Sequence, residues 1–438
     1  MSDLLDAVRA GADAAELSEC ELPSRFTAAY TLKNEVGIFE GETDKDVRRS
    51  LHVGEVEMPE LAPDECVVAV MSAAINFNTV WSAIFEPVPT FAFLEKFGRQ
   101  GWNGARHNLP YHILGSDGSG VVVRTGVGVK HWKVGDKVVI SPSYVDEEDH
   151  ASYDDGMMTE TQLAWGFETN FGSLGEYCIV KANQLIKKPR HLSWEESAAN
   201  TLCASTAYRM LVGKHGAQMK QGDVVLVWGG TGGLGSYATQ LVRNGGGIPV
   251  AVVGSEAKAD LVRAQGCEHV INRKELELGE RGFRHPKAGR ILGEAVRRLV
   301  GEDPQIVFEY LGAETFGASV YVAKRGGKIV TCGSSTGYKH EYDNRFLWMR
   351  LKSIVGSHGF NYHEAVETNR LISLGMIHPT LSKVFPLTEA AEATRAVQTN
   401  QHIGKVAVLC GALKENEGID DYAMRERIGE DKINLYRH

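Results

Sequence analysis

Hydrophobic residues follow two different patterns along the chain, and the change falls near residue 220. Between about residues 222 and 356, short apolar runs alternate with segments in which apolar residues recur at helical spacing. The first run, Val224–Trp228, is continuously apolar, which is typical of a parallel strand covered on both faces. The alternation predicts an α/β domain with a doubly wound parallel sheet. Its predicted strands read VVLVWG, IPVAVVG, HVIN, QIVFEYLG and GKIVTCGSS.

Between about residues 26 and 188 the apolar runs are shorter and are interrupted by glycine and proline. Examples are CVVAVMSAAINFN, GSDGSGVVVRTG, VGDKVVISP and GEYCIV. This pattern predicts an irregular, mostly β domain. After the parallel sheet, residues 363–375 are predicted to form a helix, and residues 405–411 a strand that returns to the β domain.

Three polar segments complete the prediction. Residues 1–20 have the pattern of an acidic amphipathic helix. Residues 146–160 are acidic and poor in apolar side chains, which favours a solvated surface loop. Residues 414–438 are expected to form a peripheral helix, and an oligomer contact there is one interpretation.

A glycine motif follows the first predicted strand of the parallel sheet. Gly230, Gly232 and Gly235 form G-x-G-x-x-G, and apolar residues at helical spacing come directly after it. In a Rossmann-type fold the first glycine allows a tight turn, the second lets the backbone approach a pyrophosphate, and the third lets the helix pack closely. A plain glycine turn is the alternative, but the strand and helix around the motif disfavour it. The candidate cofactor-binding residues here are Gly230, Thr231, Gly232, Gly233, Leu234 and Gly235.

The end of the second predicted strand indicates which dinucleotide binds. A protein that holds the ribose 2′-OH of NADH usually carries Asp or Glu there, whereas this chain has Ser255 followed by Lys258. A hydroxyl and a cation suit a 2′-phosphate, so NADPH is favoured over NADH. Arg273, after the third strand, could stack on the adenine or hold the phosphate. Against this, Glu256 lies close by, and Lys258 could simply be a solvated helix residue.

The motif divides the chain into three expected segments. Residues 1–210 hold the N-terminal helix and the first part of the catalytic β domain, residues 211–356 hold the dinucleotide-binding domain, and residues 357–438 return to the catalytic domain and end in a helix. With the dinucleotide domain inserted in this way, the nicotinamide is expected in the cleft between the two domains.

Composition excludes several classes of function. The 438 residues are 43% hydrophobic and carry a net charge of −9, with no basic stripe for nucleic acid. No apolar run approaches the length of a membrane span and the N-terminus lacks a basic leader, so we expect a cytoplasmic protein. The seven cysteines are scattered and are read as reduced thiols. Neither C-x-x-C nor H-E-x-x-H occurs, so no metal site is predicted.

Longer motifs resemble a known family. GSDGSGVVVRTGVGVKHWKVGDKVV and GGTGGLG are similar to medium-chain dehydrogenase/reductases, whose catalytic domain is GroES-like. The zinc-free branch is indicated because GSD stands where zinc alcohol dehydrogenases carry Gly-His-Glu. Over residues 30–409 the chain resembles the crotonyl-CoA carboxylase/reductases, in the stretches INFNTVWSAIFEP, LPYHILGSDGSG, WGFETNFGSL, STAYRMLV, ETFGASV, YDNRFLWM and IVGSHGFNYHEA.

The resemblance implies a reaction and a site. The family transfers a hydride from NADPH to the β carbon of a 2-enoyl-CoA, and the enolate then attacks CO2 at the α carbon to give an alkylmalonyl-CoA. By resemblance, Asn78 would donate its amide N–H to one CO2 oxygen, and His358 would orient the other side directly or through water. Phe167 would shield the pocket, and Glu168 would fix a neighbouring group or a water. Each residue also has a structural alternative: a turn cap for Asn78, core packing for Phe167, solvent exposure for Glu168 and a loop contact for His358.

Further roles come only from the resemblance. Thr206 would contact the nicotinamide half of the cofactor, and Tyr208 would either do so or pack within its helix. Cations near the cleft are expected to meet the phosphates of CoA, although such residues on a helix are often only solvated. The candidates are Arg345, Arg350 and Lys352. The family also implies a homo-oligomer, a dimer or a dimer of dimers.

The chain departs from the family pattern at two places. Gly359 stands where the crotonyl enzymes carry Phe after the histidine, and Tyr310 and Leu311 stand where they carry His and Pro. If Gly359 lines the acyl pocket, the lost benzyl group leaves room for additional methylenes, each worth about 0.8 kcal/mol when buried. A longer substrate such as octenoyl-CoA, used for polyketide extender units, is therefore expected. Phe360 could instead fill the same space and keep the pocket short.

Two alternatives remain. An enoyl-CoA or quinone reductase that protonates the enolate would share the fold and NADPH but would not need the set of four CO2 residues. A non-catalytic NADPH-binding protein would not need the whole cleft, and hydride transfer to any enoyl-CoA would exclude it.

Overall fold

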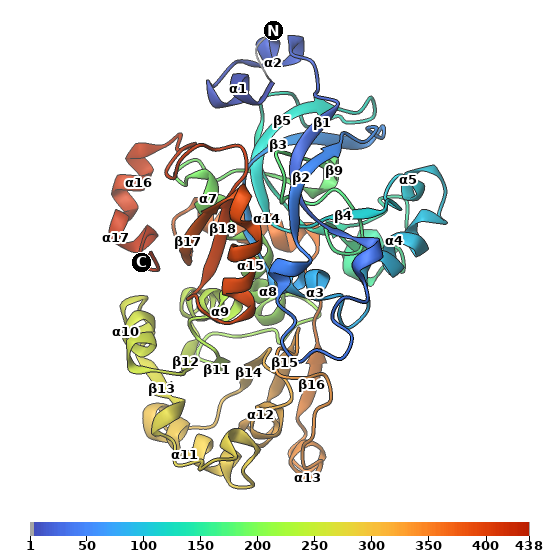
Figure 1. The fold of residues 1–438 in the computed structure, drawn as a ribbon. Coiled ribbons are helices and arrows are strands. Elements are labelled where there is room, and N and C mark those ends of the chain that lie inside the picture. Colours follow the sequence, from blue (N-terminus) through green and yellow to red (C-terminus); the bar gives the residue numbers. More distant parts are fainter. Residues whose placement is uncertain (1–3, 438) are drawn as a thin grey trace.

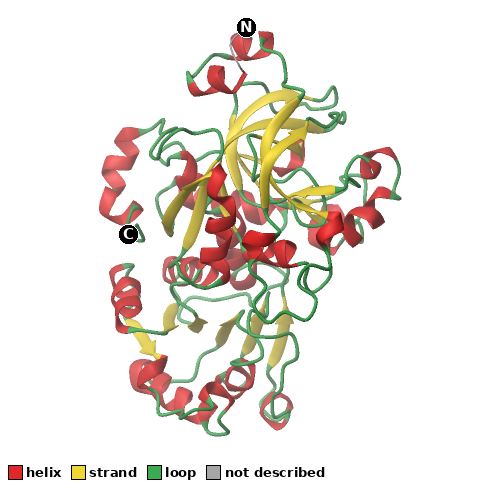
Figure 2. Cartoon of the chain, in the orientation of Figure 1, coloured by secondary structure: helices red, strands yellow, loops and turns green. Residues whose placement is uncertain are grey.

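The structure is a computed structural model of the chain and describes residues 4–437. Two lobes lie one above the other (Figure 1). The upper lobe contains most of the strands in a strongly twisted arrangement, and the lower lobe contains an open sheet with helices around it (Figure 2).

The sheet of the lower lobe has six parallel strands in the order β13-β12-β11-β14-β15-β16. The strands are β11 (Val224–Trp228), β12 (Ile248–Val253), β13 (His269–Asn272), β14 (Ile306–Glu309), β15 (Lys328–Thr331) and β16 (Ser353–Gly356). The helices between them are α9 (Gly233–Asn244), α10 (Glu256–Ala264), α11 (Ala288–Val300), α12 (Phe316–Val322) and α13 (Arg345–Trp348). Counted from β11 the order is 3-2-1-4-5-6, which confirms the predicted Rossmann-type doubly wound sheet.

Both faces of β11 are covered, as its apolar sequence predicts. Val225 and Val227 pack against α9 and against α8 (Thr201–Leu211) and α14 (Tyr362–Ser373). Val224 and Leu226 pack on the other side, with side chains of α11 and α12. Because α8 and α14 lie outside residues 211–356, the packed core of this lobe extends beyond those limits, and the three-segment division stays a prediction.

The upper lobe is built around β3 (Glu65–Ile75), which is buried along its whole length. Its seven-stranded sheet runs β10-β6-β5-β3-β18-β17, with β9 also paired to β3. Strand β18 (Lys405–Leu409) is antiparallel to β3, so the chain returns to this lobe after the parallel sheet, as expected. The other strands here are β5 (Gly118–Thr125), β6 (Lys137–Ile140), β9 (Tyr177–Lys181), β10 (Leu185–Lys187) and β17 (Leu381–Pro386).

Smaller elements surround this sheet. A three-stranded sheet contains β1 (Arg25–Leu32), β2 (His52–Glu57) and β4 (Tyr111–Ile113), and a two-stranded sheet contains β7 (Ser143–Tyr144) and β8 (Leu163–Ala164). The helices are α3 (Phe77–Ile84), α4 (Thr90–Gly98), α5 (Trp102–Ala105), α7 (Trp194–Ala198) and α15 (Ala390–Gln398), with 3-10 turns η1 (Lys33–Glu35), η2 (Val47–Arg49), η4 (Ala182–Gln184) and η7 (Leu387–Glu389). The lower lobe adds η5 (Arg273–Glu275) and η6 (Gly282–Arg284).

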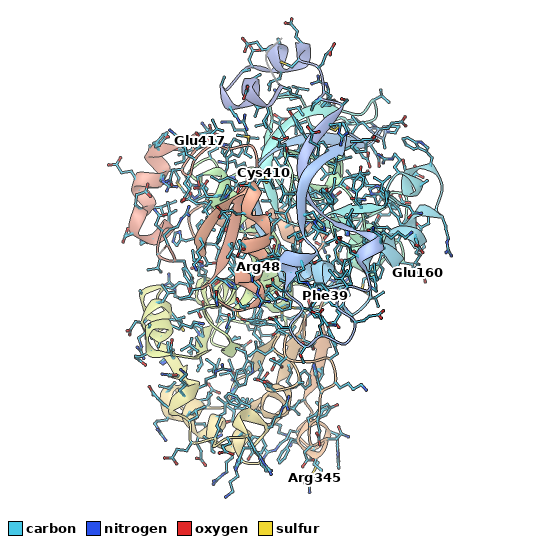
Figure 3. All side chains as sticks on the ribbon, viewed as in Figure 1. Phe39, Arg48, Glu160, Arg345, Cys410 and Glu417 are labelled. Carbon is cyan, nitrogen blue, oxygen red and sulfur yellow. The ribbon has the colours of Figure 1, made fainter. Side chains whose placement is uncertain are left out.

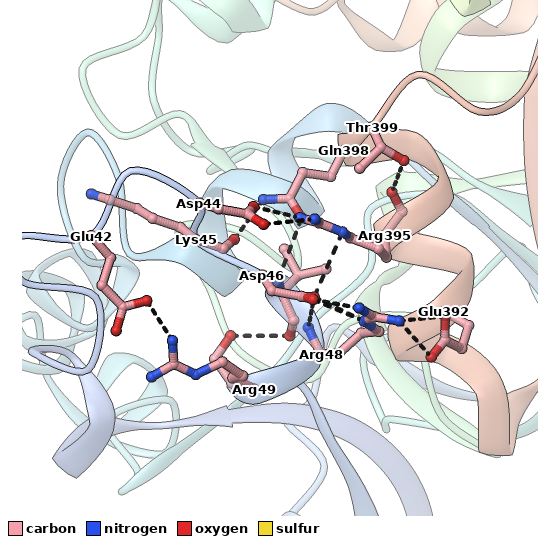
Figure 4. Close-up of polar contacts among 12 residues, drawn as sticks. Glu42, Asp44, Lys45, Asp46, Arg48, Arg49, Glu392, Arg395, Gln398 and Thr399 are labelled. Atoms are coloured by element: carbon pink, nitrogen blue, oxygen red, sulfur yellow. Dashed lines mark hydrogen bonds and ion pairs between the residues drawn. The ribbon is translucent and has the colours of Figure 1, made fainter.

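Charged side chains attach the loop after β1 to α15 (Figure 4). Arg395 on α15 contacts Asp44 at 3.0 Å and Asp46 at 3.7 Å, and Arg48 contacts Glu392 at 3.4 Å. The neighbouring guanidinium groups hold the pKa of Asp46 down to about 2, against the opposing effect of burial. Residues more than 340 positions apart are therefore joined by ion pairs.

The two terminal segments differ from the prediction. In place of one N-terminal helix, α1 (Leu4–Arg9) and α2 (Ala14–Glu19) are separated by a turn at Gly11, whose φ of +75° interrupts the helix; residues 1–3 lie outside the described residues. The C-terminal segment forms α16 (Tyr422–Ile428) and α17 (Glu430–Ile433). It is not merely peripheral, because Arg425 is buried and pairs with Glu196 of α7 at 2.7 Å.

The acidic segment 146–160 also differs from a plain solvated loop. It contains α6 (Ser152–Asp155) and η3 (Gly156–Met158), and the Asp155 side chain is buried. Asp155 accepts hydrogen bonds at 2.7 and 3.2 Å from Arg209 of α8, and Arg209 donates another to Glu364 of α14 at 2.8 Å. The acidic segment is thus attached to the lower lobe by a buried ion pair, which its sequence does not indicate.

Candidate active site between the lobes

The glycine turn between β11 and α9 is too crowded for side chains. A Cβ on Gly235 would lie 2.2 Å from the Gly229 carbonyl oxygen, and one on Gly230 would lie 2.8 Å from the Ala251 Cβ. The residue before the helix, Gly232, offers no side-chain cap, so the first backbone N–H groups of α9 are available to a ligand. This turn lies at the carboxyl ends of the strands, where doubly wound sheets bind dinucleotides.

Tyr310 stands directly over this turn, which sequence analysis did not foresee. Its hydroxyl donates to the Gly229 carbonyl at 2.9 Å. The turn after β14 is fixed by the buried Glu309 carboxylate, which accepts from the hydroxyls of Thr315 at 3.0 Å and Ser319 at 2.5 Å. The only signal in the sequence was the departure from the family's His-Pro at Tyr310 and Leu311.

Ser255, Lys258 and Arg273 lie close together at the end of β12. Ser255 caps α10, and a Cβ on Gly254 would lie 3.4 Å from the Arg273 Nε. Burial and the charge of Arg273 both lower the pKa of Lys258. Within residues 4–437 neither cation has an ion pair, and the nearby Glu256 is held by Arg263 at 2.7 Å. Two cations without acidic partners fit a dinucleotide with a 2′-phosphate.

Helix α8 borders the cofactor turn. Thr206 is buried on it, and Tyr208 is half-buried and packs against the core of the lower lobe. The packing alternative for Tyr208 therefore describes its main contact in the structure. The contact of Thr206 with the nicotinamide stays a prediction.

Asn78 lies in the first turn of α3, and its amide meets Ser116. The Asn78 Nδ2 is 2.9 Å and the Oδ1 is 3.1 Å from the Ser116 Oγ. Asn76 at the start of the same helix also donates to Ser116, at 3.4 Å, and to the Asp117 carboxylate at 3.0 Å. The amide of Asn78 therefore bonds to a side chain of the β domain and does not cap its own helix.

Phe167 and Glu168 follow β8 in a loop that packs closely against the same segment. A Cβ on Gly166 would lie 1.9 Å from the Gly115 carbonyl oxygen, and the Ser173 N–H donates to that oxygen at 3.0 Å. The Phe167 ring lies 5.9 Å from the ring of Phe93 on α4. Glu168 accepts from the Ala164 N–H at 2.8 Å, so it fixes its own turn.

His358 and Gly359 leave the carboxyl end of β16 toward the upper lobe. His358 is exposed, and within residues 4–437 no hydrogen bond or ion pair joins it to Asn78, Phe167 or Glu168. A Cβ on Gly359, whose φ is +51°, would lie 3.0 Å from the terminal methyl carbon of Met157. Phe360 is fully buried in a separate cluster, and its carbonyl accepts from the Ser143 hydroxyl at 2.5 Å.

The expected cations for CoA do not gather at this edge of the sheet. Lys352 is buried and donates to the carbonyls of Val320 and Tyr321 at 2.7 and 2.9 Å. Arg345 pairs with Asp343 at 2.6 Å, and Figure 3 shows it at the end of the lower lobe away from the upper one. Arg350 is exposed close to the same end. Their role in CoA binding stays a prediction, and Lys352 has its ammonium group engaged elsewhere.

A buried ion pair joins the GSD segment to the start of β18. Asp117 and Lys405 are 3.3 Å apart and both are buried. Burial raises the pKa of Asp117, and the Lys405 charge opposes this rise. In the part of the chain described, no three His, Cys, Asp or Glu residues are grouped as metal ligands, and no disulfide joins any of the cysteines. No helix in residues 4–437 is long and apolar enough to cross a membrane.

Comparisons with known proteins show which proteins the chain is similar to. The family model of the alcohol dehydrogenase GroES-like domain matches residues 62–190, and that of the zinc-binding dehydrogenases matches residues 233–373. The chain is 51% identical to a crotonyl-CoA reductase of Streptomyces collinus, over 100% of this chain and 99% of the relative. It is 39% identical to the crotonyl-CoA carboxylase/reductase of Cereibacter sphaeroides, over 85% of each.

A solved structure is similar over the whole chain. The 2-octenoyl-CoA carboxylase reductase CinF, in complex with NADP and 2-octenoyl-CoA, superimposes with a TM-score of 0.97 at 56% identity, over 100% of this chain and 99% of that one.

If Ser255, Lys258 and Arg273 bind the 2′-phosphate, then removing one of these side chains should lower the affinity for NADPH more than the affinity for NADH. Arg273→Ala should weaken NADPH binding about tenfold or more, as expected for a lost bond to a charged group, while NADH binding changes little. Fluorescence titration of both cofactors measures this. Arg290→Ala, which removes an exposed arginine paired with Glu294, is the control. An equal loss for NADPH and NADH would contradict recognition of the phosphate by Arg273.

Proposed function

The chain belongs to the crotonyl-CoA carboxylase/reductase family, and on this premise we propose that it reduces a 2-enoyl-CoA with NADPH and carboxylates the product with CO2 to an alkylmalonyl-CoA. The observation that carries the proposal is the Asn78 amide, which is held by Ser116 beside the loop of Phe167 and Glu168. The cations at Lys258 and Arg273, which have no acidic partner among the described residues, support NADPH as the cofactor.

Different residues are proposed to bind the cofactor and to stabilise the charge that forms on CO2. NADPH, when bound, supplies a hydride to the β carbon. The glycine turn and the N-terminus of α9 hold the pyrophosphate, and Ser255, Lys258 and Arg273 hold the 2′-phosphate. The enolate carbon then attacks CO2, and negative charge develops on the CO2 oxygens. The Asn78 N–H donates to one of these oxygens, which stabilises the charge as it forms.

Water must be kept from the enolate, because a proton at the α carbon would end the reaction as a saturated acyl-CoA. We assign this task to the wall formed by Phe167 and Phe93. Glu168 keeps the loop in shape through the Ala164 N–H. His358, whose side chain is exposed, is assigned to the other side of the CO2.

A simple enoyl-CoA reductase is the alternative function. It shares the fold and the cofactor site, and it needs no donor for CO2. The partly buried contact that holds the Asn78 amide favours the carboxylating enzyme, because protonation by solvent requires no such donor.

The reaction product distinguishes the carboxylating enzyme from a simple reductase. With NADPH, a 2-enoyl-CoA, bicarbonate and carbonic anhydrase, mass spectrometry should find a product heavier by one carboxylate than the saturated acyl-CoA. The mass should rise by one unit when the bicarbonate carries ¹³C. If saturated acyl-CoA is the sole product, the enzyme does not carboxylate, and the simple enoyl-CoA reductase is the function that remains.

We propose further that the acyl chain is longer than crotonyl. Gly359 adds no side chain after β16, and the ring of Phe360 is fully buried against Val139 and Ile186, so it does not replace the missing ring. Met157 is the side chain nearest to this position. A methionine is flexible enough to move aside for an acyl chain.

Substitution of Gly359 tests the preference for a longer acyl chain. Gly359→Phe should reduce kcat/KM for octenoyl-CoA relative to crotonyl-CoA by about tenfold or more, since each excluded methylene forfeits about 0.8 kcal/mol. Because φ is +51°, any side chain strains the backbone, so Gly359→Ala is the matched control for strain alone. An unchanged ratio in Gly359→Phe relative to Gly359→Ala would contradict a pocket at this position.

We also propose that the protein is a homo-oligomer and that it works in the cytoplasm. Strand β16 is the edge of the parallel sheet, and large apolar side chains are exposed beside it. Trp348 is 61% exposed and Leu351 is 67% exposed, with Met349 and Ile354 next to them. An exposed apolar patch at a free sheet edge is typical of a protein interface.

The interface is tested by light scattering. Wild-type protein should have the mass of a dimer or a larger assembly, and Trp348→Glu should reduce it toward the monomer. Leu413→Glu, an equally exposed apolar residue elsewhere, should leave the mass unchanged. A monomeric wild type, or a Trp348→Glu variant that keeps its mass, would contradict this interface.

A further inference from the structure

Three polar side chains meet beside the candidate CO2 site: Asn76, Asn78 and Ser116. Asn76 and Asn78 both reach the hydroxyl of Ser116, which lies in the segment before β5. Ser116 and Asn76 are buried, and Asn78 is half-buried. Hydrogen bonds in a buried site are strong, and their geometry is fixed by the packing around them.

The contact determines how the Asn78 amide is turned. Both amide atoms, Nδ2 and Oδ1, lie within 3.1 Å of the same Ser116 oxygen, so the edge of the amide that carries them faces Ser116. One N–H of Nδ2 lies on this edge. The other N–H points away from it and has no partner within residues 4–437. A single serine hydroxyl therefore orients the amide and leaves one donor free.

Ser116 is itself held by buried charge. The Asn76 Nδ2, 3.4 Å from the Ser116 hydroxyl, also donates to Asp117 at 3.0 Å, and the Asn76 Oδ1 accepts from Lys405. Lys405 and Asp117 form the buried ion pair. The residue before Lys405, Gly404, donates its N–H to Thr231 in the cofactor turn at 2.8 Å. The orientation of Asn78 is thus connected, through side chains as far as Lys405 and then through the backbone, to the segment proposed to bind the cofactor.

We propose that Ser116 is a positioning residue that sets the branching between carboxylation and protonation by orienting the Asn78 amide. This inference rests on the proposed function. In the carboxylation step the enolate carbon forms a bond to the CO2 carbon, and the electron pair of one C=O bond moves to its oxygen. The free Asn78 N–H donates to that oxygen. When the amide is not held, the α carbon takes a proton from water, and the product is the saturated acyl-CoA.

The test measures the product ratio at limiting bicarbonate together with the rate of NADPH oxidation. Ser116→Ala should lower the ratio of carboxylated to saturated product about fivefold, the effect of one hydrogen bond, while NADPH oxidation stays within about threefold of wild type. Ser119→Ala is the matched control, because Ser119 is an equally buried serine whose hydroxyl donates to the Trp194 carbonyl. Its product ratio should equal that of wild type.

A double-mutant cycle separates positioning from a general structural effect. If Ser116 acts through Asn78, then adding Ser116→Ala to Asn78→Ala should change the ratio no further. An unchanged ratio in Ser116→Ala, or an equal fall with and without Asn78, would overturn the inference. Ser116→Cys, which keeps a weak donor, should give an intermediate ratio and serves if the alanine variant does not fold. A wild type that makes only saturated product rejects the proposed function itself, whereas failure of the inference alone leaves wild-type carboxylation intact.

Discussion

The buried ion pair between Asp117 and Lys405 is the interaction on which the site depends. The Asp117 carboxylate accepts from Asn76, from the Leu202 N–H of α8 at 2.8 Å and from Lys405 of β18. These partners come from segments that are far apart in the sequence. Removing one member of such a pair leaves an uncompensated buried charge, which costs about 3 to 5 kcal/mol. The pair therefore fixes α8 and β18 against the segment that carries Ser116.

The buried ion pair lies between the residues proposed for hydride transfer and those proposed for carboxylation. Gly404 bonds to the cofactor turn, and Ser116 bonds to Asn78, so one buried cluster joins the segment proposed to bind the cofactor to the residue proposed to bind CO2. Backbone contacts extend the cluster to Phe167, because Gly166 and Gly172 allow their loop to lie directly on the carbonyls of Leu114 and Gly115. A site built in this way keeps its geometry before substrate binds.

Local patterns predicted much of the fold and of the cofactor site. The apolar run of β11 and the glycine motif each depend on neighbours within a few residues, and the structure has the predicted strand, turn and helix there; the role of Ser255 and Lys258 stays a prediction. Contacts between distant segments were not predictable in this way. Asp155 looked solvated because its partner Arg209 lies 54 positions later, and Lys352 looked free because its acceptors lie on a different helix. Lys405, a charge at the start of an apolar strand, was the one visible sign of the buried ion pair.

The most direct measurement is a crystal structure of the protein with NADP⁺ and a 2-enoyl-CoA. The account predicts the 2′-phosphate between Ser255, Lys258 and Arg273, the pyrophosphate at the N-terminus of α9, and the α carbon of the acyl group facing the free N–H of Asn78. The Ser116 contact should be retained in the complex. An α carbon that faces away from Asn78, or an Asn78 amide turned away from Ser116, would contradict the account.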